Sequence, residues 1–217
     1  MSVRLHRNGR TRRWLGERLG GDVELGDRVW RRVLHVIGAA VLVYFLLPPH
    51  AFIVAPNEVV LLLALALVLV LEALRHLAGW ELPTIRPHER ERIASFAWYA
   101  MALTAAVLVF PEPVAMVVVL GTAIVDPIAG EVRLLHRRAL YPALPLIAYA
   151  AIAAVSLAGF FGWTLAGALV AATLAATVGV ASEFPKHPLV DDDLAMTLVP
   201  GIALALTLAL WPTLTTL

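Results

Sequence analysis

Long apolar runs separated by short polar gaps make up most of the chain after residue 32. The runs lack the alternation of apolar and polar positions that marks a membrane β-strand, and each is close to the roughly 20 residues that a helix needs to cross a bilayer. The pattern therefore predicts an all-α polytopic membrane protein with about seven transmembrane helices. The expected spans lie at about 33–48, 58–77, 93–110, 113–130, 142–161, 163–181 and 194–212.

The basic residues all fall on one side of this seven-span pattern. The 17 Lys and Arg residues precede span one or lie at the junctions between spans two and three, four and five, and six and seven. Loops rich in Lys and Arg stay in the cytoplasm. We therefore expect a multi-pass protein of the cell membrane with a cytoplasmic N-terminus and an outer C-terminus. Of the 16 acidic residues, only Glu58 and Glu112 lie at outer ends, so any polar active site should face the cytoplasm.

Composition narrows the function classes. Hydrophobic residues make up 60% of the chain, which leaves room for a basic cytoplasmic segment (1–30) and a single transmembrane domain (31–217). Cysteine is absent, which excludes disulfides, thiolate metal sites and Cys nucleophiles. Glycine-rich nucleotide-binding motifs are also absent. The basic loops lack the interleaved aromatic residues of a nucleic-acid platform, so we expect no nucleic-acid partner.

Asp126 is the first candidate for chemistry, because it lies inside an apolar run and directly precedes Pro127. A charge at membrane depth is costly and is usually paired or functional. Glu131 and Arg133 follow within two helical turns. Carboxylates beside an arginine could hold a magnesium ion and a phosphate. The alternative is a structural ion pair that joins two helices.

Three adjacent carboxylates, Asp191, Asp192 and Asp193, precede the last span. They repel one another unless a cation or several donors relieve the repulsion, which suggests metal or nucleotide binding. The alternative is a solvated loop in which Asp193 is the N-cap of the last helix.

Two further pairs of residues lie at the inner ends of spans, and the two members of each pair are one helical turn apart in the sequence. Arg31 or Arg32 lies one turn from His35, which could act as a general base or simply as a hydrogen-bonded residue at the interface. Glu72 and Arg75 have ion-pair spacing, which more often has a structural role than a catalytic one.

Four segments give the chain a resemblance to the CTP-dependent polyprenol kinases, which include dolichol kinase and phytol kinase. RRVLHVIG resembles the opening segment of the family, and Glu72 with Arg75 ends the second span as in many members. VDPIAGEVR is similar to the helix end that bears the family's aspartate. EFPKHPLVDDDLAMTLVPG is similar to the terminal signature, in which a Glu and a short loop precede Asp-Asp-Asn-Leu. These segments are residues 31–38, 72–75, 125–133 and 183–201.

The resemblance implies transfer of the γ-phosphoryl group of CTP to the hydroxyl of an isoprenoid alcohol in the bilayer. It implies Mg²⁺ as cofactor, held through Asp126 with Asp191 and Asp192. Asp126, Asp192 and His35 would be catalytic, and His35 or a carboxylate would take the proton of the alcohol. The implied nucleotide-binding residues are Arg32, Glu131, Arg133, Glu183 and Lys186.

Departures from the family pattern keep other functions open. Gly121-Thr122 stands where the family has Gly-Asp, the Lys-Ser and Glu-Gly loop is not recognisable in 134–145, and Asp193 replaces the usual Asn. A divergent kinase, a relative with another phosphate donor and an inactive paralogue all fit this pattern. So do a cytidylyltransferase like the CDP-diacylglycerol synthases, a small transporter and a structural membrane subunit. Association into a homo-oligomer is also compatible with the sequence.

Overall fold

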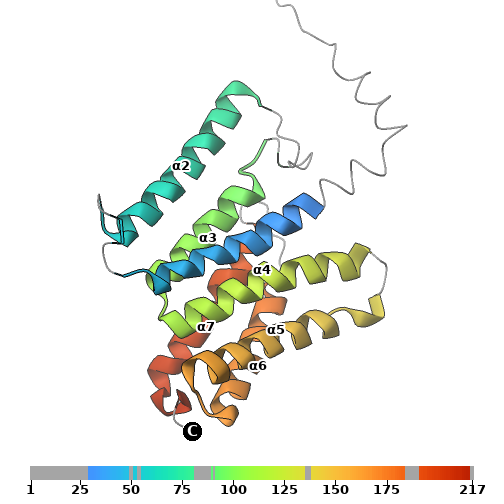
Figure 1. The fold of residues 1–217 in the computed structure, drawn as a ribbon. Helices are drawn as coiled ribbons and strands as arrows, with labels where there is room; N and C mark the ends of the chain where they lie inside the picture. The colour runs from blue at the N-terminus through green and yellow to red at the C-terminus, as the bar shows by residue number, and fades with distance from the viewer. Residues whose placement is uncertain are drawn as a thin grey trace, which may run out of the picture.

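The structure is a computed structural model that describes residues 29–48, 51–52, 55–80, 89, 91–134, 138–183 and 191–215. Lys186 and most of the basic segment 1–30 therefore lie outside the described residues. The described part is all-helical, apart from one isolated bridge between Phe52 and Ala55. This confirms the expected all-α class (Figure 1).

Each of the seven predicted runs coincides with a helix. Five of the described helices are long and apolar enough to cross a membrane, and α3 and α6 are shorter apolar helices. The 18-residue first helix, Val29–Leu46, ends in the 3₁₀ segment η1, Ala39–Leu46, and α5 continues into the π-helical turn η4, Ser156–Phe160. The other elements are α2 Asn57–Ala78, α3 Ser95–Val109, α4 Glu112–Leu134, η3 Arg138–Leu140, α5 Ala143–Val155, α6 Leu165–Ala181, α7 Asp192–Leu210 and η5 Pro212–Thr215.

Local sequence explains where several helices begin and end. Gly79 ends α2 in the left-handed conformation (φ +63°), and its N–H donates to the carbonyl of Arg75. Thr164 caps α6 by accepting from the N–H of Gly167. The expected end of the fourth span, at about residue 130, was too early, because α4 continues to Leu134. Glu131 and Arg133 therefore lie on α4, where their ion pairs with other elements hold the last turn in place.

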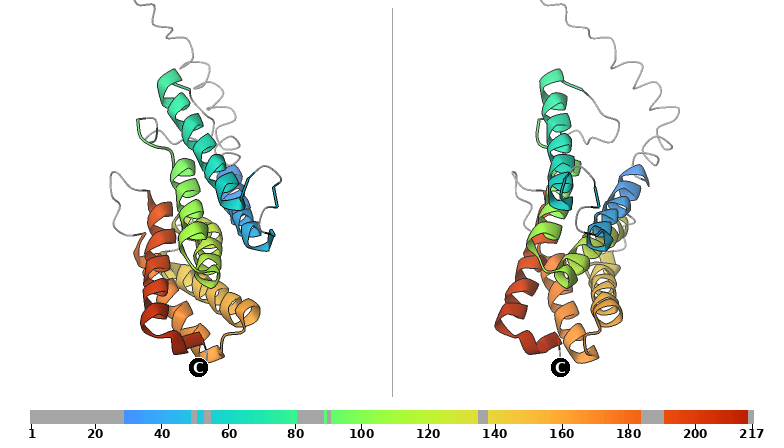
Figure 2. Two further views of the ribbon diagram at one scale, coloured as in Figure 1. Left: turned by 90° about the vertical axis from the view of Figure 1, so that its left-hand side faces the viewer. Right: turned by 60° about the vertical axis from the view of Figure 1, so that its left-hand side comes forward.

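Helix α4 is the core of the bundle. It packs against α5 and α7 and also contacts α3, α6 and η1. Its valines and alanines are fully buried, including Val117, Val118 and Ala123. Helix α2 contacts mainly α3 and leans away from the other helices in Figures 1 and 2. Its apolar side chains, like those of the first helix, are mostly exposed. The fold is thus a compact group around α4 with two helices at its edge.

Tyr149 of α5 shows why small residues are needed in this core. Its ring is fully buried between Gly121 of α4 and Gly179 of α6. A Cβ at Gly121 would lie 2.3 Å from Cζ of Tyr149, and a Cβ at Gly179 would lie 2.8 Å from Cε2. Because neither glycine has a side chain, the ring of Tyr149 fits between α4 and α6 and the three helices approach closely. The ring fills the space between them and cannot shift to make room for a larger residue.

We expect Gly121→Ala to destabilise the fold, because the new methyl group overlaps a ring that cannot shift. Overpacking of this kind costs about 1–3 kcal/mol, which exceeds the roughly 1 kcal/mol by which alanine favours a helix over glycine. The measurement is the thermal unfolding midpoint of the full chain in detergent. Gly130→Ala on the same helix is the matched control, since no atom lies within 4 Å of its added Cβ. That control should keep or raise the midpoint, and an equal loss in both variants would contradict the packing argument.

Candidate metal and phosphate site

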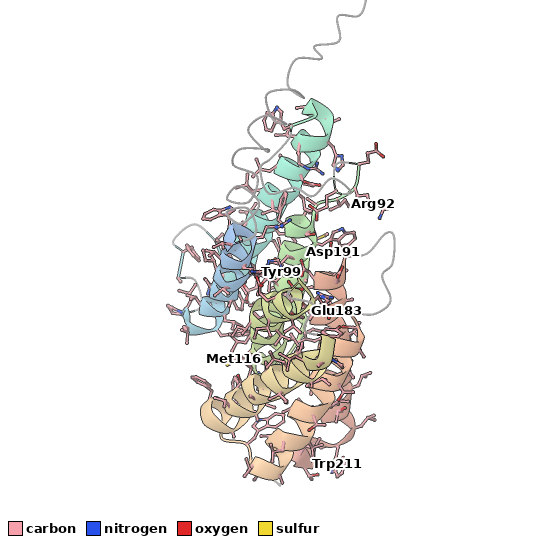
Figure 3. All side chains as sticks on the ribbon, turned by 90° about the vertical axis from the view of Figure 1, so that its right-hand side faces the viewer. Arg92, Tyr99, Met116, Glu183, Asp191 and Trp211 are labelled. Atoms are coloured by element: carbon pink, nitrogen blue, oxygen red, sulfur yellow. The ribbon has the colours of Figure 1, made fainter. Side chains whose placement is uncertain are left out.

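Ionisable side chains gather at one end of the bundle. We call it the polar end and define it by the start of the first helix, the end of α2, the start of α3, the end of α4 and the start of α7. Figure 3 shows Arg92, Asp191 and Glu183 toward this end and Trp211 at the opposite end. Among the residues that the structure describes, those that the sequence singled out for chemistry therefore lie at the polar end.

His35, Asp126 and Asp193 meet at the polar end from three different helices. Nε2 of His35 lies 3.1 Å from Oδ1 of Asp193 and 3.6 Å from Oδ2 of Asp126. One ligand atom from each residue lies within 4.8 Å of the others, a separation at which they could share a metal ion. We call these three residues the triad. The side chain of Asp126 is 26% exposed and that of Asp193 only 6%, so the triad opens on the Asp126 side.

Two contacts fix the imidazole ring of His35 in place. The ring stacks on Tyr99 of α3, with centroids 4.4 Å apart and an angle of 17° between the planes. The hydroxyl of Tyr99 donates to the backbone carbonyl of His35 at 2.7 Å, and Nδ1 of His35 donates to the carbonyl of Arg31 at 3.2 Å. Gly38 permits this packing, because a Cβ there would lie 2.4 Å from Cε1 of Tyr99. The orientation of Nε2 toward the carboxylates is therefore set by the fold.

Asp191 positions the start of α7. Its Oδ1 accepts from the N–H of Asp193 at 3.2 Å, so Asp191 is the N-cap. The alternative in which Asp193 is the N-cap is wrong, because Asp193 already lies inside the first turn and faces His35. The hydroxyl of Ser95 lies 2.9 Å from Oδ2 of Asp191 and 2.7 Å from Oε1 of the buried Glu89. Ser95 thus links the start of α3 to the start of α7.

A threonine pair joins α4 to α7 one turn deeper than the triad. Oγ1 of Thr122 lies 2.9 Å from Oγ1 of Thr197, and both residues are fully buried. Thr197 also donates to the carbonyl of Asp193 at 2.8 Å. Thr122 precedes Asp126 by four residues, and Thr197 follows Asp193 by four, so the two contacts between the helices are in register. This pair helps to hold Asp126 opposite Asp193.

Two arginine–carboxylate pairs flank the triad. Arg32 of the first helix forms an ion pair with Glu131, and Arg133 forms one with Glu183. Tyr141 donates its hydroxyl to Oε2 of Glu183 at 2.8 Å. Burial, and then the bond to Glu183, raises the pKa of Tyr141 to about 12, so this donor keeps its proton at neutral pH. Burial also raises the pKa of Glu183, against the opposing effects of Tyr141 and Arg133. Both predicted phosphate-binding arginines are thus held at the polar end.

Glu72 and Arg75 form a buried pair that secures the entry to α3. Nε and Nη2 of Arg75 donate to the two carboxylate oxygens of Glu72 at 2.8 and 2.7 Å. Nη2 also donates to the carbonyl of Arg92 at 2.8 Å, and Oε1 of Glu72 accepts from the N–H of Ala94 at 2.8 Å. The pair therefore ties α2 to the segment that precedes Ser95.

The structure brings together some of the predicted site residues and separates others. Asp126 and His35 lie together, and the end of α4 that carries Asp126 converges with the start of α7. The carboxylate from α7 is Asp193, however, whereas Asp191 caps the helix and Asp192 is not part of the triad. Helical spacing could have identified Asp193, because the buried positions of α7 follow it at intervals of three and four residues. These positions are Asp193, Met196, Thr197, Pro200, Gly201 and Leu204.

Comparisons with known proteins identify no relative of this chain: no family model, no curated protein and no solved structure matches it.

We expect Glu72→Gln to lower stability by about 3 kcal/mol or more, because it leaves the buried guanidinium of Arg75 without its full counter-charge. The measurement is the denaturant midpoint in mixed micelles, together with hydrogen exchange at the Ala94 amide, which should become faster. Glu58→Gln is the control at the other, exposed end of the same helix. It should change stability by less than about 0.5 kcal/mol. Equal losses in both variants would show that the buried pair has no special role.

Proposed function

We propose that this protein is a membrane lipid kinase that transfers a phosphoryl group from CTP, or another nucleoside triphosphate, to the hydroxyl of an isoprenoid alcohol. In this proposal all seven helices cross the cell membrane, with the N-terminus and the polar end in the cytoplasm. The observation that carries it is the meeting of His35, Asp126 and Asp193 from three helices at the polar end. The resemblance of the four sequence segments to polyprenol kinases supports the same function.

The position of the triad suits a reaction between a lipid and a water-soluble nucleotide. The apolar chain of the alcohol would lie among the exposed leucines of the helices, with its hydroxyl at the cytoplasmic interface. The nucleotide would arrive from the cytosol. Phosphoryl transfer depends mainly on positioning and on stabilisation of charge, and the enzyme needs little covalent chemistry of its own. A site at the boundary between the two phases therefore meets the main requirement.

The resemblance implies Mg²⁺ as the cation of this chemistry, and the residues at the polar end have the donor groups of a divalent-cation site. Asp126 and Asp193, with His35, would hold the ion, because their ligand atoms converge from three helices. When bound, a divalent cation neutralises charge on phosphate oxygens.

Arg32 and Arg133 are the groups that would bind the phosphates. Each already holds a carboxylate, Glu131 or Glu183, at the edge of the site. A guanidinium binds phosphate and carboxylate with the same two-pronged geometry, so a phosphate can replace the carboxylate without leaving the arginine unpaired. Lys186 would add a further positive charge.

Phosphoryl transfer also needs a base that accepts the proton of the alcohol, and Asp126 is the residue proposed for this role. The alcohol oxygen forms a bond to the γ-phosphorus while the bond from that phosphorus to the β–γ bridging oxygen breaks, and the nucleoside diphosphate leaves with the electron pair. The proton of the alcohol goes to a base within hydrogen-bond reach. Asp126 is the more exposed carboxylate of the triad, and its Oδ1 is not the oxygen that faces His35. It is therefore the proposed proton acceptor.

The experiment is a transfer assay with the full chain in lipid nanodiscs. CTP or ATP carries label at either the γ or the α phosphate, and the acceptors are farnesol, geranylgeraniol, phytol, dolichol and diacylglycerol. Label from the γ position in an isoprenoid phosphate supports the kinase. Label from the α position in lipid would replace it with a cytidylyltransferase. Absence of transfer from every donor to every acceptor would overturn the proposal.

Asp126→Asn and Asp193→Asn should each lower the rate of transfer by about a hundredfold or more, the usual cost of removing a pre-organised charged group from a site of this kind. Both substitutions keep the size of the side chain, and helix content by circular dichroism checks the fold. Glu112→Gln, at the other end of α4, is the matched control and should keep the wild-type rate. Near-normal rates in both Asn variants would remove the triad from the reaction.

A further inference from the structure

The hydrogen bonding of His35 leaves acceptor atoms facing one another at the centre of the triad. A carbonyl oxygen can only accept, so the bond to the carbonyl of Arg31 places a hydrogen on Nδ1. In the neutral ring, Nε2 then carries a lone pair. This lone pair faces Oδ1 of Asp193 and Oδ2 of Asp126, which are also acceptors, at 3.1 and 3.6 Å. Three acceptors facing one another repel unless a cation lies between them.

A proton, on the ring or on a carboxylate, or a metal ion could satisfy this arrangement. Two atoms that bind one ion at about 2.1 Å lie about 3.0 Å apart in octahedral geometry and about 3.4 Å apart in tetrahedral geometry. The distances from Nε2 to the two carboxylate oxygens, 3.1 and 3.6 Å, are close to these values. Nε2 of His35 therefore lies at a suitable distance from each carboxylate oxygen for the two atoms to share an ion.

The surroundings of His35 are those of a metal ligand. A histidine that binds a metal usually donates its other ring N–H to a carboxylate or a backbone carbonyl, which fixes the tautomer and the direction of the ring. His35 makes this bond to the carbonyl of Arg31, and Tyr99 holds the ring from one face. The backbone of Asp193 is also fixed, because its N–H donates to Oδ1 of Asp191 and its carbonyl accepts from the hydroxyl of Thr197. The bonds made by the residues around the triad thus leave Nε2 and the carboxylate oxygens directed at a common point.

We propose that His35, Asp126 and Asp193 bind a divalent first-row transition metal in preference to Mg²⁺, and Mn²⁺ is the probe used to test this. Mg²⁺ favours oxygen ligands and retains its water, whereas imidazole nitrogen favours transition metals. A site with one imidazole nitrogen and two carboxylates should therefore bind a transition metal more tightly than Mg²⁺. The use of this metal in catalysis rests on the proposed function, but its binding can be measured without nucleotide or lipid alcohol.

The experiment is a Mn²⁺ titration of the full chain in nanodiscs, followed by electron paramagnetic resonance. We expect one bound Mn²⁺ per chain, with pulsed-resonance coupling to one ¹⁴N nucleus, and displacement by Mg²⁺ only in large excess. His35→Gln replaces the nitrogen ligand with an oxygen of similar reach. It should abolish the ¹⁴N coupling, weaken Mn²⁺ binding about tenfold or more, and reduce the preference over Mg²⁺. Asp126→Asn should weaken both ions, and Glu112→Gln should change neither.

Absence of saturable Mn²⁺ binding in the folded wild-type chain would overturn the inference and identify the triad as an imidazolium between two carboxylates. Binding without ¹⁴N coupling would also overturn it, and so would binding that His35→Gln leaves unchanged. If His35→Gln fails to fold, the ¹⁴N coupling of the wild type and the Asp126→Asn titration still decide. Lipid phosphorylation without metal in the triad would leave the kinase standing and remove this inference. Metal binding without any phosphoryl transfer would support this inference and overturn the proposed kinase.

Discussion

The contact of one imidazole with two carboxylates from different helices is the constraint on which the polar end depends. Asp126 and Asp193 repel each other, and His35 lies between them with its ring direction fixed by Tyr99 and the carbonyl of Arg31. The close packing of α4 against α7 makes this contact possible, and the paired Thr122 and Thr197 keep the two helices in register. A cation at Nε2, whether a proton or a metal, offsets the repulsion between the carboxylates. The structure therefore couples helix packing directly to the charge state of the site.

The remaining polar groups form layers around this centre. The Glu72–Arg75 pair orders the segment before α3, and Ser95 at the start of α3 contacts Asp191. Asp191 in turn caps the helix that carries Asp193. A buried ion pair gives little net stability by itself, because desolvation offsets the attraction between the charges. Here the pair has a second consequence, since it fixes a chain of contacts that leads from α2 to the triad.

Much of the fold followed from the sequence, because the length and apolar character of each run are local properties. All seven runs are helices, and Asp126 and His35 were recognised individually as charged or titratable groups at unusual depth. Asp193 was not predicted as the ligand from α7, although the positions that follow it at intervals of three and four residues mark the buried face of that helix. The cap formed by Asp191 is the part that became visible only in the structure. Ser95 and Tyr99 look like ordinary polar residues of an apolar helix in the sequence, and their contacts with Asp191 and His35 became visible only once the neighbouring helices were placed.

The exposure of the charged side chains indicates how a ligand would reach the triad. Exposure falls from 26% at Asp126 through 16% at His35 to 6% at Asp193, so the site opens on one side and is closed by α7 on the other. On the open side, the pair formed by Arg32 and Glu131 is more exposed, at 25% and 37%. A phosphate that enters there meets the guanidinium before it reaches the triad. Because the phosphate would take the place of the Glu131 carboxylate, Arg32 would keep an anionic partner. The positive charge of Arg32 would also offset the repulsion between the incoming phosphate and the two aspartates.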